Sequence, residues 1–479
     1  MDIDMKIKIQ EAPLTLSWIA KATDGVLMTD GKAVPDIRYI CTDSREADAE
    51  TLFCAIVGER VDGHNYISAA MKLGCRAVLC QKQPGEALCA VVVPDTVTAM
   101  GKLAEAYKNE FLADLFTVAV TGSVGKTTTK ECLAAVLSQE ERLFKKDGNY
   151  NSTIGLPLSV TEISRDHTAA VLEMGMSGFG EIQSMTRVVH PDVACIINIG
   201  TSHMEHLGSR EGIATAKLEI IEGMRQGSTL LINGDEPLLH QAHGFCRERG
   251  ITCLRVSLSD ATADFYADAI TAKEGGMIFD LHTPNGVLSG LTLPAVGYHM
   301  VWAAAFAAAV GVLRGMTHER IKCGLSTYRP AGMRQNITTE DRVTYIEDCY
   351  NAAPESMAAA LSVLKLTAKG RMIAVLGDMK ELGDNTIALH RAVGQKVAEL
   401  SRENGEVYLV TVGELGSEIA RGATEALPTD RVFVSRDPAP YEDAVRHLKT
   451  LLREGDTVLF KASRAMTLEV IAKAVKSND

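Results

Sequence analysis

A glycine-rich segment near residue 120 constrains the fold of this chain more than any other feature. The apolar run Phe116-Thr-Val-Ala-Val120 predicts a buried strand, and the apolar spacing from Lys130 to Leu137 predicts a helix. Between them lies the tight loop Thr121-Gly-Ser-Val-Gly-Lys-Thr-Thr128. A strand, a glycine-rich loop and a helix in this order form a phosphate-binding unit. The segment therefore predicts an α/β domain with a nucleotide site at the end of a strand.

The loop supplies the groups that a nucleoside triphosphate needs. Glycines at 122 and 125 let backbone N–H groups converge on phosphate oxygens at the helix N-terminus. Lys126 is expected to reach the β- and γ-phosphates, and the Thr127 hydroxyl to bind Mg²⁺. Val120 stands where the general pattern has glycine, and a glycine-rich turn without a ligand is the alternative. The expected ATP-binding residues of the loop are Gly122, Ser123, Val124, Gly125, Lys126, Thr127 and Thr128.

Short β-type runs alternate with helical ones along most of the chain, which predicts an α/β fold with a parallel sheet covered by helices. Residues 263–293 instead show short alternating segments separated by Gly275-Gly276 and Asn285-Gly286, a pattern typical of antiparallel hairpins at a sheet edge. The expected strands are Thr117 to Val120, Ala169 to Leu172, Ala194 to Asn198, Thr229 to Ile232, Met372 to Leu376, Val407 to Val412 and Thr457 to Lys461.

The length of 479 residues corresponds to about three domains. One boundary is expected before Phe111, where a helix-like segment gives way to the nucleotide-binding strand. A second is expected near 328–332, a Tyr-Arg-Pro-Ala-Gly turn before a new β-type run. The sequence thus predicts a small N-terminal α/β domain (1–110), a central P-loop-type domain with helices on both faces of a parallel sheet (111–330), and a C-terminal Rossmann-like α/β domain (331–479).

Charge and composition exclude several classes of partner and location. The net charge of −12 argues against a general affinity for nucleic acid or for anionic membranes. The first twenty residues lack the apolar core of a signal peptide. The longest apolar run, Val301 to Leu313, is short of a membrane span and is expected to form a buried helix. The eleven cysteines form no CxxC pair and are expected to be reduced core thiols of a cytoplasmic protein.

Polar side chains follow two of the expected strands, and a third group lies on a helix. Glu173 ends one strand, in position to hold Mg²⁺, although a glutamate there is more often simply solvated. His203 follows another strand, where a hydrogen-bonded histidine is the alternative to a ligand. Lys217 shares a helix with Glu219 and Glu222, and on composition alone this helix presents a solvated charged face.

Taken together, these segments resemble the Mur ligases, the ATP-dependent amino-acid ligases of peptidoglycan precursor synthesis, over nearly the whole chain. Within the family they are similar to the branch that uses D-alanyl-D-alanine, because residues 348–357 resemble the run YNANPxSM and the sequence has no DNP-type or GKGHE-like motif. The matching segments are Thr42-Asp-Ser-Arg45, Gly58 to His64, Thr121 to Thr127, Asn149 to Pro157, Glu173-Met-Gly175, Asn198 to His203, Lys217-Leu-Glu219, Asp348 to Met357, Gly377 to Gly383 with His390, and Lys461-Ala-Ser-Arg464.

The resemblance implies an enzyme of cell-wall biogenesis with ATP and Mg²⁺ as cofactors. ATP is expected to convert the terminal carboxylate of UDP-N-acetylmuramoyl-tripeptide to an acyl-phosphate. The amine of D-alanyl-D-alanine then attacks, giving ADP, phosphate and the UDP-muramoyl-pentapeptide, with no covalent enzyme intermediate. Closure of the C-terminal domain is expected to exclude water from the acyl-phosphate, which predicts a monomer with mobile domains.

The same resemblance implies roles for individual residues. Lys217 is expected to be carbamylated by CO₂ and to form the catalytic set with Lys126 and His203. The implied Mg²⁺ ligands are Thr127, Glu173 and His203, and Arg334, Asp348 and Asn351 complete the ATP site. The implied substrate contacts are Thr42, Asp43, Ser44, Arg45 and His64 for the uridine nucleotide, Asn149, Asn151 and Thr153 for the acyl substrate, and Ser463 and Arg464 for the dipeptide.

The chain departs from the family pattern at three positions. Ala353 stands where Asn is usual, and Met300 and Ala303 replace the amides of a Gly-x-His-Asn-x-x-Asn run. The changes at Met300 and Ala303 predict that adenine binding is weaker or that other groups supply the contacts to adenine. The alternatives are a related ligase with another acceptor such as folate, a P-loop regulatory ATPase, and an inactive homologue. The Thr42-Asp-Ser-Arg45 block favours a UDP-sugar substrate over folate.

Overall fold

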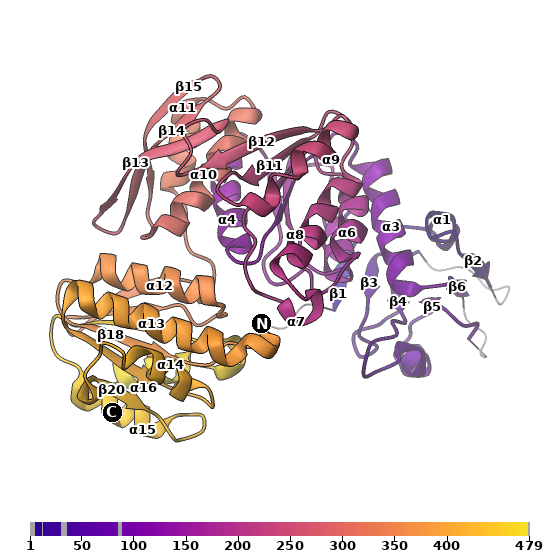
Figure 1. Cartoon of the computed structure of the whole chain (residues 1–479). Coiled ribbons are helices and arrows are strands. Elements are labelled where there is room, and N and C mark those ends of the chain that lie inside the picture. The colour runs from indigo at the N-terminus through magenta and orange to yellow at the C-terminus, as the bar shows by residue number, and fades with distance from the viewer. Residues whose placement is uncertain (1–4, 12, 30–35, 85–88, 478–479) are drawn as a thin grey trace.

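Three sheets organise the molecule, one in each of three α/β domains (Figure 1). The structure, a computed structural model, describes residues 5–11, 13–29, 36–84 and 89–477. The predicted fold class is confirmed. The domain boundaries at 110 and 330 stay predictions.

The N-terminal sheet has six strands in the order β1-β3-β4-β5-β6-β2. Its inner strands pair in parallel, and the two edge strands pair antiparallel. The elements are β1 (Lys6–Lys8), α1 (Leu16–Ala22), β2 (Val26–Met28), β3 (Tyr39–Cys41), β4 (Thr51–Cys54), α2 (Ile67–Lys72), β5 (Ala77–Cys80), β6 (Cys89–Val92) and α3 (Thr96–Phe111).

The central sheet has nine strands in the order β15-β14-β13-β12-β11-β10-β7-β9-β8. The strands at the β8 end of this order, up to and including β13, pair in parallel with their neighbours. At the other edge, β13, β14 and β15 pair antiparallel, which confirms the predicted hairpins. The elements are β7 (Phe116–Thr121), α4 (Lys126–Leu137), β8 (Leu143–Lys145), α5 (Gly155–Thr161), β9 (Ala169–Glu173), α6 (Glu181–Val189), β10 (Val193–Ile196), α7 (Met204–Leu207), α8 (Arg210–Leu218), β11 (Thr229–Asn233), α9 (Ala242–Glu248), β12 (Thr252–Ser257), β13 (Phe265–Lys273), β14 (Gly276–Thr283), β15 (Gly286–Leu293), α10 (Tyr298–Leu313) and α11 (His318–Ser326).

Alternating side chains of the central strands reach two different cores. On β7, Val118 and Val120 belong to the core formed with α4 and α10, whereas Ala119 belongs to the core formed with α5 and α6. This period of two is the geometry of an extended strand, and it explains why the strands are apolar on both faces. Helices therefore cover both faces of the sheet, as predicted.

The C-terminal sheet has six strands in the order β16-β17-β21-β18-β19-β20, all parallel except the edge strand β16. Helices α12, α13 and α14 cover one face and α15 and α16 the other, a Rossmann-like arrangement. The elements are β16 (Asn336–Glu340), β17 (Val343–Glu347), α12 (Pro354–Thr367), β18 (Met372–Leu376), α13 (Thr386–Asn404), β19 (Val407–Thr411), α14 (Gly416–Ala423), β20 (Val432–Val434), α15 (Glu442–Leu451), β21 (Thr457–Lys461) and α16 (Glu469–Lys476).

Helix α10 is the buried helix predicted from the apolar run. It begins three residues before that run, at Tyr298, and most of its side chains, including Phe306 and the alanines from Ala303 to Ala309, are buried. The small alanine side chains allow close packing against α4. In the described part of the chain, no helix is both long and apolar enough to cross a membrane.

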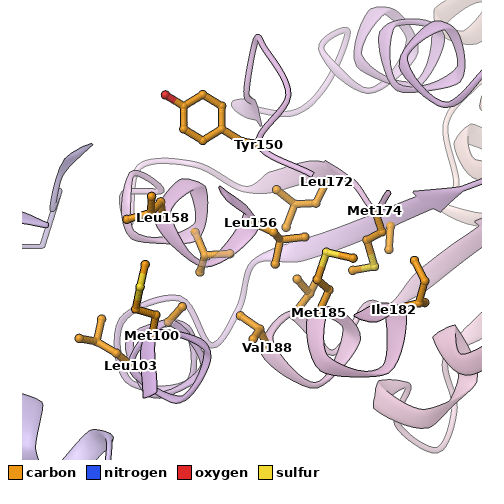
Figure 2. Packing of buried hydrophobic residues seen from close by; sticks show 14 of the residues in the cluster. Met100, Leu103, Tyr150, Leu156, Leu158, Leu172, Met174, Ile182, Met185 and Val188 are labelled. Carbon is orange, nitrogen blue, oxygen red and sulfur yellow. The ribbon is translucent and has the colours of Figure 1, made fainter. Parts of the chain in front are cut away.

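One hydrophobic core runs without interruption from the N-terminal sheet into one face of the central sheet. Figure 2 shows its middle, where Met100 and Leu103 of α3 lie beside Leu158 of α5 and Val188 of α6. The C-terminal domain is built on two other clusters, one on each face of its sheet, and Val296 of the central domain joins one of them. The first two domains therefore share a hydrophobic core, whereas the third domain packs mainly around separate ones.

The cysteines follow the prediction with two exceptions. All eleven are free, and nine are buried. Cys253 is only partly buried, and Cys323 is exposed on α11, so the expectation of a core thiol is wrong there. The reason is amphipathicity, because α11 turns Ile321, Gly324 and Leu325 inward and leaves Cys323 on its outer side.

A buried ion pair closes the end of the C-terminal sheet and carries a stability prediction. Arg371 donates from Nε and Nη2 to the two carboxylate oxygens of Asp456 at 2.8 and 2.7 Å, and Asp456 is almost fully buried. Arg371→Ala leaves that carboxylate without its cation. We expect the free energy of unfolding of the C-terminal domain to fall by about 3 kcal/mol.

The control for this prediction is an exposed ion pair in the same domain. Arg342 and Glu454 are both largely exposed, so Arg342→Ala is expected to change the free energy of unfolding by less than about 1 kcal/mol. Denaturant unfolding monitored by circular dichroism compares the two variants. Equal losses would show that burial does not set the strength of the Arg371–Asp456 pair.

Candidate active site

A cavity of about 600 Å³ lies between the central and C-terminal domains, and we call it the interdomain cavity. The central domain contributes the phosphate loop, the ends of β9 and β10, and the first turns of α10. The C-terminal domain contributes the segment before β16, the end of β17 and the first turns of α12. Of the residues predicted for the site, Ser123, Val124, Gly125, Lys126, Thr127, Thr128, Asn149, Asn151, Glu173, His203, Arg334, Asp348 and Asn351 line it.

The phosphate loop has the geometry that its glycines require. Gly125 caps α4 with φ of 82°, a left-handed conformation that favours glycine. Gly122 packs so closely against the end of β10 that an added Cβ would lie 2.3 Å from Ile197 Cγ1. The N–H groups at the start of α4 therefore face the cavity, where a phosphate would accept their hydrogen bonds.

Asn198 holds the loop in place, a role that sequence reasoning missed. Its Oδ1 accepts hydrogen bonds from the N–H groups of Ser123 and Val124 at 2.9 and 3.0 Å, and its Nδ2 donates to the Val124 carbonyl at 2.8 Å. The sequence contains a signal for this role, because Asn198 is a polar residue just beyond the end of a buried strand that neighbours the loop's own strand. The loop is thus fixed before any nucleotide binds.

Lys126 lies on the cavity floor with its ammonium turned onto the loop. Its Nζ donates to the carbonyl oxygens of Gly122 and Ser123 at 2.8 and 3.4 Å. Burial lowers the pKa of this amine, the Glu173 carboxylate opposes that shift, and the Arg334 guanidinium adds to it. A cation so placed is poised to exchange its carbonyl partners for phosphate oxygens.

Glu173 is the carboxylate closest to the loop, and both of its oxygens are engaged. Thr127 Oγ1 donates to Oε2 and Asn151 Nδ2 donates to Oε1, each at 2.8 Å. The three side chains come from α4, the end of β9 and the segment before α5. The structure thus brings together two predicted Mg²⁺ ligands and one predicted substrate contact.

His203 stands at the domain interface with φ of 63°, at the N-terminus of α7. Its Nδ1 lies 3.1 Å from Oε2 of Glu381, which belongs to the C-terminal domain. Burial lowers the pKa of the imidazole, and the Glu381 carboxylate opposes that shift. The contact leaves Nε2 available and ties the ring's orientation to the position of the C-terminal domain.

Lys217 is buried behind the cavity wall on α8, with only 2% of its surface exposed. Among the described residues, none forms a hydrogen bond or ion pair with its amine. Burial, together with the charge of Lys126, lowers the pKa of Lys217 well below its ordinary value. Burial without a charged partner therefore favours the neutral amine over the ammonium.

The donor set fits Mg²⁺ bound together with a nucleotide. The described residues contain no cluster of three or more His, Cys, Asp or Glu that could hold a metal by itself. Mg²⁺ typically binds one or two carboxylates together with substrate phosphates. The Thr127 hydroxyl and the Glu173 carboxylate beside the phosphate loop meet that requirement, because ATP would complete the ligand set.

The C-terminal wall of the cavity is ordered by Lys461, a second residue that the site prediction omitted. Its buried Nζ donates to Asp348 Oδ2 at 2.6 Å and to the Asn351 carbonyl at 3.0 Å. Arg334 lies 3.7 Å above the ring centre of Tyr350, and the Tyr350 hydroxyl donates to Asn149 Oδ1 at 2.5 Å across the domain interface. The three predicted ATP contacts of this domain therefore share one wall.

The other predicted residues lie outside the interdomain cavity. In the N-terminal domain, Arg45 pairs with Asp43 at 2.5 Å, and the hydrogen bond from Arg45 lowers the pKa of Asp43. His64 uses both ring nitrogens locally, since Nδ1 contacts Asp62 and Nε2 accepts from the Gln81 N–H. The residues outside the cavity are Thr42, Asp43, Ser44, Arg45, His64, Gly122, Thr153, Lys217, Ser463 and Arg464.

The residues predicted to contact the dipeptide are engaged within the C-terminal domain. Ser463 is buried and its Oγ accepts a hydrogen bond from the Lys380 N–H at 3.0 Å. Arg464 pairs with Glu469 at 2.5 Å. The three departures from the family pattern, Met300, Ala303 and Ala353, all line the interdomain cavity.

Family models match three consecutive parts of the chain. The model described as Mur ligase family, catalytic domain, matches residues 36–108. The Mur ligase middle domain matches residues 120–311, and the Mur ligase, glutamate ligase domain, matches residues 333–464.

The chain also resembles curated relatives and solved structures along its length. It is 38% identical over 465 residues to the UDP-N-acetylmuramoyl-tripeptide–D-alanyl-D-alanine ligase of Bacillus subtilis, covering 96% of this chain and 97% of that one. The Escherichia coli enzyme of the same name is 32% identical, with 97% and 99% covered.

Two solved structures agree with this chain along most of their length. The crystal structure of MurF from Acinetobacter baumannii superposes with a TM-score of 0.87 at 31% identity, covering 97% of this chain and 99% of that one. MurF ligase from Thermotoga maritima in complex with ADP gives 0.80 at 28% identity, covering 91% and 96%. With three matching models in order and relatives that are similar over their full length, the chain belongs to the Mur ligase family.

Proposed function

We propose that this ATP-dependent ligase joins D-alanyl-D-alanine to UDP-N-acetylmuramoyl-tripeptide in peptidoglycan synthesis. The observation that carries the proposal is the interdomain cavity, in which a phosphate loop faces a second domain's charged wall. The names of the full-length relatives supply the substrate pair. The products are ADP, phosphate and the UDP-muramoyl-pentapeptide.

The reaction proceeds in two steps because a carboxylate is a poor electrophile at neutral pH. An oxygen of the tripeptide carboxylate attacks the γ-phosphorus of ATP, ADP departs, and an acyl-phosphate remains. The free amine of D-alanyl-D-alanine attacks the acyl carbon, loses a proton, and the tetrahedral intermediate expels phosphate. No enzyme side chain forms a covalent bond in either step.

The residues of the interdomain cavity stabilise the charge that moves during phosphoryl transfer. Lys126 and the N–H groups at the start of α4 face the phosphates, and Arg334 approaches them from the C-terminal domain. Mg²⁺, held by Thr127 and Glu173, would neutralise charge on the phosphate oxygens. His203 and a carbamylated Lys217 would complete the proposed metal environment.

Binding of the remaining substrate parts is divided among the domains. The proposed uridine nucleotide contacts are Thr42, Asp43, Ser44, Arg45 and His64 of the N-terminal domain. Asn149, Asn151 and Thr153 are proposed for the acyl substrate, and Asp348 and Asn351 for ATP. Ser463 and Arg464 are proposed for the dipeptide. The protein is proposed to act as a monomer in the cytoplasm, a location that its eleven free thiols support.

The proposal is tested by measuring ADP release from purified protein with Mg-ATP, UDP-N-acetylmuramoyl-tripeptide and D-alanyl-D-alanine, omitting each in turn. We expect ADP release to require both substrates, and mass spectrometry to detect a product heavier by one dipeptide residue. ADP release without either substrate would instead identify an ATPase. Release with a different carboxylate or amine would identify a related ligase.

A further inference from the structure

Gln335 presents a buried oxygen with no partner to the interdomain cavity. Its Nε2 donates a hydrogen bond to the carbonyl oxygen of Val296, in the turn that leads into α10. A carbonyl oxygen only accepts, so the nitrogen end of the amide must face Val296 and Oε1 must point the other way. Within the described part of the chain, Oε1 is buried and accepts no hydrogen bond. The residue lines the cavity.

The backbone at this residue is also in an uncommon conformation. Gln335 has φ of 47°, in the left-handed region that residues other than glycine rarely adopt. Its N–H lies 3.4 Å from Oδ1 of Asp348, which fixes the start of the side chain. A strained backbone and an unsatisfied buried acceptor both destabilise the protein alone, and such features concentrate where a ligand later satisfies them.

Two positions of the neighbouring helix lack the amides that the resembled pattern offers to a nucleotide base. Met300 and Ala303, at the start of α10, line the same cavity and stand where the resembled pattern has amides. Alanine carries no acceptor, the methionine sulfur is a weak one, and the Trp302 side chain only donates. Within the described part of the chain, Gln335 Oε1 is therefore a buried amide oxygen without a partner beside α10, where His299 offers one further ring nitrogen to the cavity.

We propose that Gln335 Oε1 accepts a hydrogen bond from the 6-amino group of the adenine of bound ATP. The inference rests on the proposed ATP site and makes Gln335 a specificity-determining residue of that site. Oε1 repels phosphate oxygens, which are acceptors themselves. The ribose is the other source of donors, but the side chain is anchored at Val296 on the α10 side of the cavity. Asp348, the carboxylate proposed for ATP on the C-terminal wall, is held by Lys461.

Nucleotide binding to the full-length protein tests this assignment without any acceptor substrate. Calorimetry compares ATP with purine riboside triphosphate, which lacks only the 6-amino group, and with 2′-deoxy-ATP. We expect the wild-type protein to bind ATP about 10-fold more tightly than the purine analogue. In Gln335→Met, which keeps the length but removes the oxygen, the two affinities should become equal through a loss for ATP alone.

The matched control is Gln395→Met on α13, an exposed glutamine that contacts Glu425 far from the cavity, and it should retain the 10-fold preference. Equal wild-type binding of ATP and the purine analogue would overturn the proposal, whether or not the variant folds. So would a Gln335→Met variant that loses discrimination against 2′-deoxy-ATP instead. Failure of the proposed function would give different results. Either the wild-type protein would bind no ATP at all, or it would prefer ATP over the purine analogue as expected and yet catalyse no ligation.

Discussion

Lys126→Ala is expected to abolish ligation, lowering the rate of ADP release with both substrates by about 10³-fold. Phosphoryl transfer concentrates negative charge on the γ-phosphate oxygens, and Lys126 is the ammonium of the phosphate loop itself. Burial lowers the pKa of this amine, and a phosphate beside it would oppose that shift and favour the charged ammonium. Steady-state ADP release measures the effect.

The fold should survive this substitution. Asn198 makes three hydrogen bonds to the loop that do not involve Lys126, so the loop keeps its shape without the ammonium. Lys396→Ala, an exposed lysine of α13, controls for the general loss of a positive charge and should leave the rate unchanged. A Lys126→Ala rate within tenfold of the wild type would remove this residue from phosphoryl transfer.

Lys217→Ala is expected to lower the rate by about 10²-fold, and a short carboxylic acid such as acetate should partly restore it. Only a neutral amine attacks CO₂, and burial together with the charge of Lys126 lowers the pKa of Lys217, which favours the neutral form. The carbamate formed would be an anion close to Lys126 and His203. Acetate can occupy the space that the truncated side chain leaves and supply the same charge.

Removing CO₂ distinguishes a carbamate from a plain lysine. Wild-type activity should fall in CO₂-depleted buffer and recover on adding bicarbonate, whereas Lys217→Ala should respond to acetate and not to bicarbonate. Lys322→Ala, an exposed lysine of α11, should behave like the wild type. A wild-type enzyme that is indifferent to CO₂, together with a fully active Lys217→Ala variant, would contradict the proposed modification.

The sequence predicts individual strands, turns and helices of this molecule well because residues close together in the chain determine them. The strand expected at Thr117 to Val120 is observed as Phe116–Thr121, and the loop and helix follow it as the glycines and apolar spacing indicate. The strand expected at Ala194 to Asn198 ends earlier, at Ile196. The reason is a contact that no periodicity reports, since Asn198 leaves the sheet to bind the phosphate loop.

The parts of the site that resisted prediction are contacts between residues distant in the chain. Lys461 meets Asp348, and Glu381 of the C-terminal domain meets His203 of the central one. Each residue is ordinary in its own sequence context, and only the packing of two domains gives it a partner. Gln335 is the hardest of these residues to predict. What distinguishes it is that its Oε1 is buried without a hydrogen bond among the described residues, and only the three-dimensional structure shows this.

The uninterrupted core that links α3 to α5 and α6 also bears on how such enzymes diversify. A fragment ending after α3 would leave Met100 and Leu103 in water, so we expect the first two domains to unfold as one cooperative unit. The third domain is built on two other clusters, and among their buried residues only Val296 comes from the segment before α10. On the proposed division of the substrates, a change of amine substrate involves a domain built largely on its own cores, whereas a change of nucleotide sugar involves a core that two domains share.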